Sequence, residues 1–397
     1  MKRFLSLLIA VALAAPLATP VMAQEEGPGA AKGAQVDTTG KGYTAAFVIE
    51  PSTRRVLFAE NADVPLPTAS MAKMMTCLIA MEEISGGRLK LTDTMITSAR
   101  ASKMGGSQIY AKEGQVFPIQ TLLAATMVQS ANDAAQMLAE KIGGSGEAFA
   151  DMMNDRARAL GMTHSRFVDP HGLPNPKDPT NINTASARDL ALLGMELMKY
   201  PLMREYAKTA TMPFANGTFT AGLTNPNHLI NPHKQDYMAD ATGIKTGYSG
   251  PAGYCVTASA KRGEMELVSV IMGARANHGP LSSFGLASRL MNESFAQYRR
   301  VAVIKKGQNV GSAAVTDGQA KTVPAIAAAD AFALVKRGEE QSVKTAFSGG
   351  AVAAPVRAGQ PVGAVSVTQN GQSIARVPAV AGSAIEKQPW WRKFWPF

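Results

Sequence analysis

The sequence predicts an α/β fold of the α+β type, in which one antiparallel sheet carries helices, followed by a small all-β domain. Strand-like runs at 45–49 and 55–59 flank a turn, and further runs at 243–246, 254–260 and 265–272 follow a long helical stretch. Because strands lie at both ends of a region with helices between, the two ends should join in one sheet. The chain has 397 residues, 46% hydrophobic and 18% charged, enough for two ordinary cores.

From Thr68 to about Pro201 the pattern is mostly helical. Apolar residues recur at three- and four-residue spacing in 71–81, 119–142, 148–160 and 187–198. The second segment is expected to break and restart at Ser130-Ala-Asn-Asp133. Residues 261–264 form a hairpin turn, and residues 280–298 form a closing helix. After about Val301, short Val and Ala runs predict the β domain, in which Asn370-Gly371 marks a hairpin.

Both ends of the chain are typical of targeting segments. A basic start (Lys2, Arg3), an apolar stretch over 4–17 and the small-residue site at 21–23 predict a signal peptide over residues 1–23. This apolar stretch is too short to span a membrane. Residues 24–41 are rich in Gly, Ala and charge and predict a flexible N-terminus. We expect a first domain at 42–298, a β-rich domain at 299–385 and a tail at 386–397.

The tail holds all three tryptophans and five aromatic residues in its last eight positions, together with Arg392 and Lys393. Aromatic rings and cations suit the headgroup layer of a membrane. The alternative is a tail that folds back onto the β domain. We favour attachment to the outer face of the cytoplasmic membrane, because such a cluster is an aggregation hazard in water.

Charge and composition exclude several classes of function. The formal net charge is +10, or +8 without Lys2 and Arg3, which suits anionic envelope surfaces of an exported, periplasmic protein. No run of Lys and Arg with interleaved aromatics predicts nucleic-acid binding. Cys77 and Cys255 are expected to be small buried hydrophobic residues, and whether they pair is left open. The histidines show no ligand spacing, so we expect no metal site and no cofactor; they are His164, His171, His228, His233 and His278.

Three short elements occur once each and in a fixed order. They are Ser70-Met-Ala-Lys73, Ser130-Ala-Asn132 and Lys245-Thr246-Gly247. Ser70 and Lys73 share a helix face, and a lysine among apolar residues favours its neutral form. Together the elements supply a nucleophile, a base, a second hydroxyl, an amide and a cation for a carboxylate. This inventory predicts serine acyl transfer without a catalytic histidine.

Each element alone has a plainer interpretation. Ser-x-x-Lys occurs by chance, and its lysine could extend to the surface. Ser130 or Asn132 could cap the next helix. Lys245 could lie on an exposed edge strand, although Gly247 would leave room there for a substrate backbone. The ordered set of three is what makes the prediction specific.

The chain resembles the low-molecular-mass penicillin-binding proteins of the D-alanyl-D-alanine carboxypeptidase type, which are serine peptidases that trim peptidoglycan. It thereby resembles the wider serine β-lactamase and penicillin-binding-protein fold. The resemblance covers nearly the whole mature chain, and Ala131 departs from the Gly of several members. The matching segments extend beyond the three elements and are 67–73, 105–108, 128–134, 167–173, 186–189 and 243–248.

The resemblance implies a role for each residue. Ser70 attacks the carbonyl of the penultimate D-Ala, Lys73 takes its proton, and Ser130 passes a proton to the departing amine. Other residues are implied to bind the stem peptide or to stabilise the oxyanion, and β-lactams are implied as covalent inhibitors. Asn132 holds an amide, Lys245 and Thr246 hold the terminal carboxylate beside Gly247, and the N–H groups of Ser70 and Tyr248 form the oxyanion hole.

Three rival functions remain. A class A β-lactamase would carry a glutamate after the second element, whereas residues 167–190 contain Asp169, Asp178 and Asp189 but no glutamate. A D,D-endopeptidase that cleaves peptidoglycan cross-links would use the same chemistry. A peptidoglycan-binding scaffold without activity would not need all of the catalytic residues.

Overall fold

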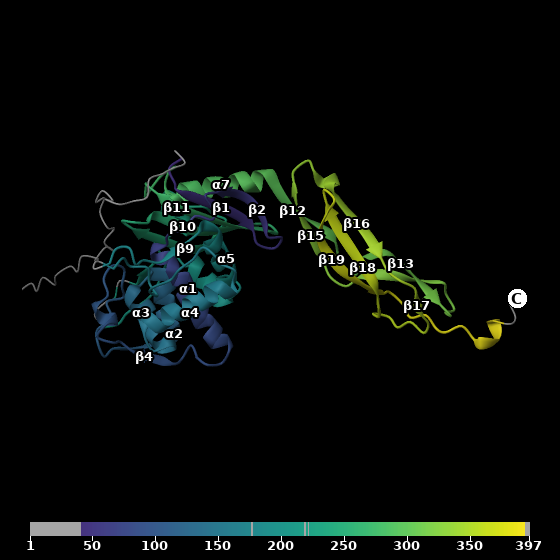
Figure 1. Ribbon diagram of the computed structural model, residues 1–397, viewed down its shortest axis with the longest axis horizontal. Coiled ribbons are helices and arrows are strands. Elements are labelled where there is room, and N and C mark those ends of the chain that lie inside the picture. The colour runs from purple at the N-terminus through teal and green to yellow at the C-terminus, as the bar shows by residue number, and fades with distance from the viewer. Residues whose placement is uncertain (1–40, 176–177, 218–219, 221, 394–397) are drawn as a thin grey trace, which may run out of the picture.

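The computed structural model describes residues 41–175, 178–217, 220 and 222–393. The predicted signal peptide and nearly all of the segment 24–41 lie outside these residues, as does the end of the tail. Figure 1 shows a body of helices and sheet, followed by an elongated β-rich domain with the C-terminal end of the chain at its far side. The predicted order of an α+β domain and a β domain is confirmed.

The first domain is built on a five-stranded antiparallel sheet made from both ends of the region, as predicted. Ala45 near the start of the domain pairs with Met272 near its end. Each predicted strand is present, and the last two join at the expected hairpin turn. In spatial order the strands are β2 (Arg55–Glu60), β1 (Ala45–Glu50), β11 (Met265–Ala274), β10 (Gly253–Arg262) and β9 (Ala241–Ser249).

Helices cover both faces of this sheet (Figure 1). Successive side chains of β1 point to opposite faces of the sheet and pack into two different cores. Phe47 packs with the helical body, and Val48 packs with α7 (Ser283–Gln297). Cys77 and Cys255 are buried and not bonded to each other. The helical body contains α1 (Lys73–Ser85), α2 (Ile119–Ala124), α3 (Asn132–Gly143), α4 (Gly146–Ala159), α5 (Ala187–Leu197) and α6 (Pro201–Lys208).

The region between β2 and β9 also contains short strands and turns that the periodicity did not predict. Strands of two or three residues offer too few positions for alternation to be recognised. The strand pairs are β3 (Leu66–Pro67) with β6 (Thr184–Ala185), β4 (Thr94–Ile96) with β5 (Val116–Pro118), and β7 (Thr211–Met212) with β8 (Leu223–Thr224). The short helices are η1 (Ala69–Ala72), η2 (Ala101–Lys103) and η4 (His228–Ile230).

The C-terminal domain is all-β, apart from the short helix η5 (Glu340–Ser342). At the predicted hairpin, Asn370 and Gly371 both have positive φ, as a tight turn between twisted strands requires. No helix in the described ranges has the length and apolarity needed to cross a bilayer. The strands are β12 (Tyr298–Ile304), β13 (Asn309–Thr316), β14 (Thr322–Ala327), β15 (Ala331–Lys336), β16 (Val343–Ser348), β17 (Val352–Ala353), β18 (Pro361–Gln369) and β19 (Gln372–Ala381).

Candidate active site

Ser70 and Lys73 lie within hydrogen-bonding distance where α1 begins. Lys73 Nζ donates to Ser70 Oγ at 2.8 Å and to the carbonyl of His171 at 2.8 Å. The side chain of Lys73 is fully buried. Burial, and then the neighbouring Lys245, hold the pKa of Lys73 well below its usual value. A neutral amine at this distance can accept the proton of the Ser70 hydroxyl.

The backbone around Ser70 has a special conformation. The predicted helix is preceded by the tight turn η1, which holds Ser70, and α1 itself starts at Lys73. Ala69 has a φ of 44°, a left-handed conformation that is unusual for alanine and is common beside functional groups. Gly172 also lies so close to the Ala69 carbonyl that a Cβ would overlap it. The loop that holds Gly172 therefore packs directly against the turn that holds Ser70.

Ser130 sits at the predicted break between two helices. A π-helical turn, η3 (Ala125–Gln129), precedes it, and Ser130 has a φ of 61°. Turns of this kind occur frequently at functional sites. The first residue before α3 is Ala131, and neither Ser130 nor Asn132 caps the helix through its side chain. The plainer interpretation of this element, helix capping, is therefore wrong.

Asn132 presents a buried acceptor atom. Its Nδ2 donates to the carbonyl of Gly105 at 2.7 Å. Its Oδ1 is buried and has no hydrogen-bond partner among the described residues. A buried acceptor without a partner is costly in free energy, so it suits a donor that arrives with a ligand. An amide N–H of a substrate has the required chemistry.

Lys245 is a buried cation without a counter-ion. Its side chain is only 2% exposed, and Nζ contacts the carbonyl of Thr246 at 3.3 Å. Within the described ranges, no carboxylate forms an ion pair with it. Burial lowers the pKa of Lys245 to about 7. A ligand carboxylate would supply the missing charge.

The residues after Lys245 follow the alternation of a regular strand. Lys245 and Gly247 are buried, whereas Thr246 and Tyr248 are partly exposed. The ring of Tyr248 stacks on that of Tyr254 with centroids 4.4 Å apart. A Cβ on Gly247 would come within 2.8 Å of the Thr68 carbonyl, so glycine permits this close packing.

The structure brings the first and third elements together most directly. Gly247 packs against the turn that holds Ser70, and Lys245 is close enough to Lys73 to lower its pKa. The second element reaches α1 through packing of η3. Among the described residues, however, no hydrogen bond joins Ser130 to Ser70 or Lys73, so the contact of these hydroxyls stays a prediction.

Sequence reasoning missed the part of the site formed by the loop at 167–173. We assigned no catalytic role to His171 from the sequence, yet its carbonyl accepts a hydrogen bond from Lys73. Asp169 fixes that carbonyl, because Oδ1 accepts from the N–H groups of His171 at 2.9 Å and Gly172 at 2.5 Å. Spacing along the chain gave no signal for this contact, since it joins distant segments through a backbone atom.

The fold and the site together define a class of protein. A partly exposed serine bonded to a buried lysine, beside a second buried lysine on the edge strand of an antiparallel sheet, is the arrangement of a serine acyl-transfer enzyme. Residues 34–276 match the family described as D-alanyl-D-alanine carboxypeptidase, and residues 298–387 match the family described as penicillin-binding protein 5, C-terminal domain. The chain belongs to the D-alanyl-D-alanine carboxypeptidase family of serine hydrolases.

Individual relatives agree with this assignment. The chain is 31% identical to the D-alanyl-D-alanine carboxypeptidase DacF of Bacillus subtilis, over 98% of this chain and 95% of the relative. It is 30% identical to a D-alanyl-D-alanine endopeptidase of Pseudomonas aeruginosa, over 62% of this chain and 75% of the relative. The crystal structure of a peptidoglycan synthesis regulatory factor from Streptococcus pneumoniae is similar with a TM-score of 0.74 and 26% identity, over 87% and 99% of the two chains.

Proposed function

We propose that the protein removes the terminal D-alanine from peptidoglycan stem pentapeptides through an acyl-enzyme on Ser70. The observation that carries this proposal is the 2.8 Å contact between Lys73 Nζ and Ser70 Oγ, made by a fully buried lysine. Family membership supports the substrate class, and the unpaired charge of Lys245 supports a substrate with a free carboxylate. No metal or cofactor takes part in the proposed steps.

In the first step, Ser70 Oγ attacks the carbonyl carbon of the penultimate D-Ala while Lys73 Nζ accepts the hydroxyl proton. The N–H groups of Ser70 and Tyr248 stabilise the oxyanion. The peptide bond then breaks and an ester to Ser70 remains. Ser130 gives its hydroxyl proton to the departing D-Ala amine and receives the proton held by Lys73, so that both groups return to their starting protonation. Water hydrolyses the ester and regenerates Ser70.

Two groups of the site orient the substrate: Lys245, which has no ion-pair partner among the described residues, and Asn132 Oδ1, which accepts no hydrogen bond from them. Lys245 binds the terminal carboxylate through a charge-assisted hydrogen bond, together with the Thr246 hydroxyl. Asn132 accepts an amide N–H on the acyl side of the stem peptide, which satisfies its Oδ1. These contacts place the scissile carbonyl over Ser70, and such positioning contributes much of the rate of an acyl transfer.

The direct test is release of D-alanine from a peptide that ends in D-Ala-D-Ala. We expect turnover by the wild type and none above background by Ser70→Ala. Ser373→Ala, which changes an exposed serine of the β domain, is the matched control and should retain wild-type activity. Equal release by wild type and Ser70→Ala would overturn the proposal.

Endopeptidase activity on cross-linked peptides is the second candidate, supported by the endopeptidase relative. The carboxylate requirement separates the two activities. A carboxypeptidase should prefer the free-acid pentapeptide to a cross-linked dimer, whereas an endopeptidase should show the reverse preference. A labelled penicillin should also acylate Ser70 in either case, because a β-lactam ring offers the same carbonyl to the nucleophile.

We further propose that the protein is exported to the periplasm and held peripherally at the membrane by its tail. Trp390 and Trp391 are 76% and 50% exposed in the short helix η6 (Trp390–Lys393). Figure 1 places this helix at the end of the β domain that lies far from the peptidase domain. A tail bound there would hold the peptidase domain away from the membrane surface.

Deletion of residues 390–397 tests this attachment. The protein should move from the membrane fraction to the soluble fraction while its D-alanine release is unchanged. A matched control that replaces only Arg392 and Lys393 with glutamine should weaken attachment to anionic lipid without abolishing it. Unchanged fractionation of the deletion variant would favour a tail folded back onto the β domain.

A further inference from the structure

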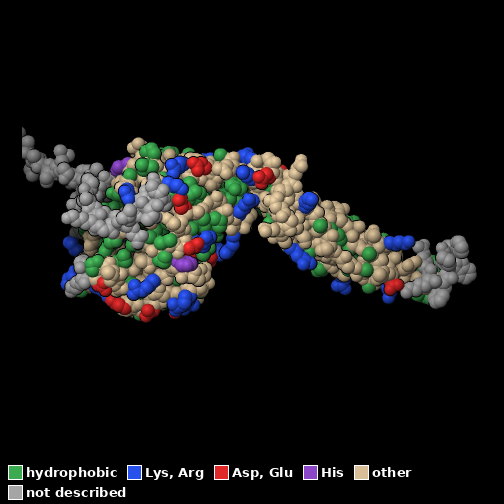
Figure 2. All heavy atoms as spheres, turned by 45° about the horizontal axis from the view of Figure 1, so that its top comes forward, with side chains coloured by type: hydrophobic (Ala, Val, Ile, Leu, Met, Phe, Trp, Pro, Cys, Tyr) green, Lys and Arg blue, Asp and Glu red, His purple; other side chains and the backbone are tan. Residues whose placement is uncertain are grey.

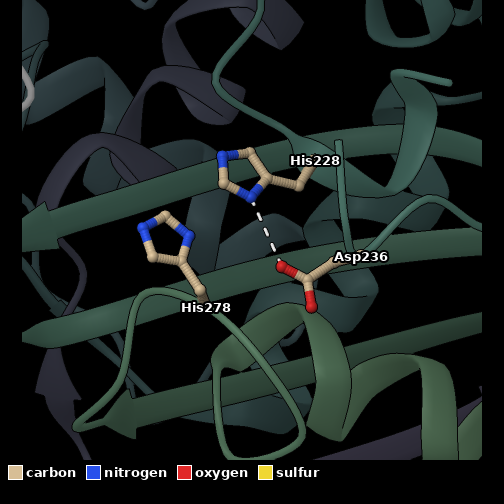
Figure 3. A group of neighbouring side chains, drawn as sticks. All are labelled: His228, Asp236 and His278. Atoms are coloured by element: carbon tan, nitrogen blue, oxygen red, sulfur yellow. Dashed lines mark hydrogen bonds and ion pairs between the residues drawn. The ribbon is translucent and has the colours of Figure 1, made fainter. Parts of the chain in front are cut away.

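Two histidines and an aspartate converge beside the sheet, on segments that carry none of the predicted catalytic residues (Figure 3). His228 belongs to η4, Asp236 to the loop before β9, and His278 to the connection between β11 and α7. Each side chain offers one ligand atom, and these atoms all lie within 4.8 Å of one another. The spacing of histidines along the chain could not indicate this cluster, because its members come from three segments.

Ring packing fixes the orientation of His228. Its ring stacks on Phe284 with centroids 4.6 Å apart and on His278 with centroids 5.4 Å apart. The two imidazole planes differ by only 4°. Nδ1 of His228 consequently faces Asp236, and one ring nitrogen of His278 points toward the same gap (Figure 3).

The carboxylate of Asp236 is buried, and its contacts in the described part of the chain do little to offset its loss of contact with water. Its side chain is only 6% exposed, and that of His228 is 10% exposed. In the described part of the chain, the Asp236 carboxylate makes one hydrogen bond, to His228 Nδ1, and its length of 3.4 Å is long for such a bond. A carboxylate removed from water needs stronger partners than this. A cation in the gap would provide the missing compensation.

The donor set is that of a zinc site. Two imidazole nitrogens, one carboxylate oxygen and an open fourth position match zinc sites that have three protein ligands. Calcium and magnesium prefer oxygen ligands throughout.

To bind zinc, the three ligand atoms would have to move only slightly closer together. Tetrahedral zinc with bonds of about 2.0–2.1 Å places its ligand atoms roughly 3.3 Å apart. The contact between His228 and Asp236 is already 3.4 Å. His278 is exposed, so rotation of its side chain can bring its nitrogen closer. The buried pair would therefore form the fixed part of the site and His278 the adjustable ligand.

We propose that His228, Asp236 and His278 bind a zinc ion, with a water molecule in the fourth position. The ion would link three segments of the peptidase domain, one of which leads directly into β9, the strand that carries Lys245. Its role would be to stabilise this part of the fold. The proposal does not depend on the peptidase function, since none of the three residues belongs to the proposed catalytic group.

Metal binding to the full chain without an affinity tag tests the proposal. After dialysis against a chelator, zinc titration should show one ion per chain. Cobalt should give the visible absorption bands of a tetrahedral site. Excess zinc, at about 100 times its dissociation constant, should raise Tm by about 5–10 °C, whereas calcium should not. Absence of stoichiometric zinc binding would overturn the proposal.

Substitutions locate the site. His278→Ala changes an exposed side chain, so the metal-free variant should keep its Tm, while zinc affinity falls by about tenfold or more and the cobalt bands disappear. Asp236→Asn should weaken zinc binding in the same way and provides a second variant. His233→Ala is the matched control, because it removes an exposed histidine on the same loop. Unchanged binding by His278→Ala, or loss in His233→Ala alone, would contradict the assignment.

Discussion

Apart from the Asp236 side chain, the peptidase domain buries five charged residues among its apolar residues, whereas no polar or charged residue is buried as a whole in the described part of the C-terminal β domain. The two cores of the β domain consist almost entirely of Ala and Val. Removing a charged group from water costs free energy, so the restriction of buried charged residues to one of the two domains needs an explanation. Figure 2 shows that both domains nevertheless carry Lys and Arg on the visible surface.

The five buried charges fall into two groups. The carboxylates of Glu50, Asp133 and Asp189 each accept hydrogen bonds from neighbouring N–H or hydroxyl groups, and so they stabilise turns and loops. Lys73 and Lys245 form no ion pair with any described residue. Burial lowers the pKa of both amines, and their hydrogen bonds go to hydroxyl or carbonyl oxygens: Lys73 donates to Ser70 and to His171, and Lys245 donates to Thr246. The comparison therefore teaches that buried lysines without an ion pair distinguish the predicted site from the rest of the described chain.

Removing Lys73 should separate activity from stability most strongly. In Lys73→Met the general base is lost while the apolar volume is kept, so acylation of Ser70 should fall by about 10²–10⁴-fold. The free energy of unfolding should change by less than about 2 kcal/mol, since a buried amine is costly in the wild type. Penicillin acylation rates and thermal melting measure the two quantities. Parallel losses of both would show that Lys73 is structural.

Removing Lys245 should affect only substrates that carry a carboxylate. Loss of its charge-assisted hydrogen bond in Lys245→Met should lower kcat/KM for a free-acid peptide by about 10–100-fold. The same peptide with a C-terminal amide makes no such contact and serves as the control. A similar loss on both peptides would place Lys245 in catalysis and not in carboxylate recognition.

The pH profile should report the same lysine. Lys245 must be protonated to bind a carboxylate, and burial lowers its pKa to about 7. Thus kcat/KM, which reports the free enzyme, should fall as pH rises through about 7. Bound carboxylate raises that pKa, so kcat should decline only at higher pH. Lys245→Arg keeps its charge, and its profile should lose the alkaline decline; an unaltered decline would contradict the assignment.

A core substitution in the β domain should have the smallest effect on catalysis. Val367 is fully buried, and Val367→Ala should reduce the free energy of unfolding by about 1–3 kcal/mol. D-alanine release from a short peptide should stay within about twofold of the wild type, because no proposed catalytic group lies in this domain. Denaturation followed in parallel with activity checks this prediction, and a large loss of turnover would show that the domains are coupled.

Local patterns predicted most of the framework. The Asn370-Gly371 hairpin, the strands of the main sheet and the break at Ser130 each depend on residues close together in sequence. The short strands such as β4 and β5 were missed, because three residues cannot display a period. The helix start was placed too early, since the turn at Ala69 depends on packing against Gly172.

The candidate site was predicted less completely than the fold. Ser70, Lys73 and Lys245 could be recognised because residue type and an apolar context indicate their chemistry. The carbonyl of His171 could not, because any residue supplies a carbonyl and only the folded chain brings it to Lys73. For the same reason the pairing of His228 with His278 became visible only in three dimensions.

Peptide mapping after reaction with a labelled penicillin tests the central claim most directly. The account predicts a single adduct on Ser70, no adduct in Ser70→Ala, and acylation of Lys73→Met that is slower by at least about 100-fold. An adduct on another residue, or unchanged acylation of Lys73→Met, would contradict the claim that the buried lysine activates Ser70.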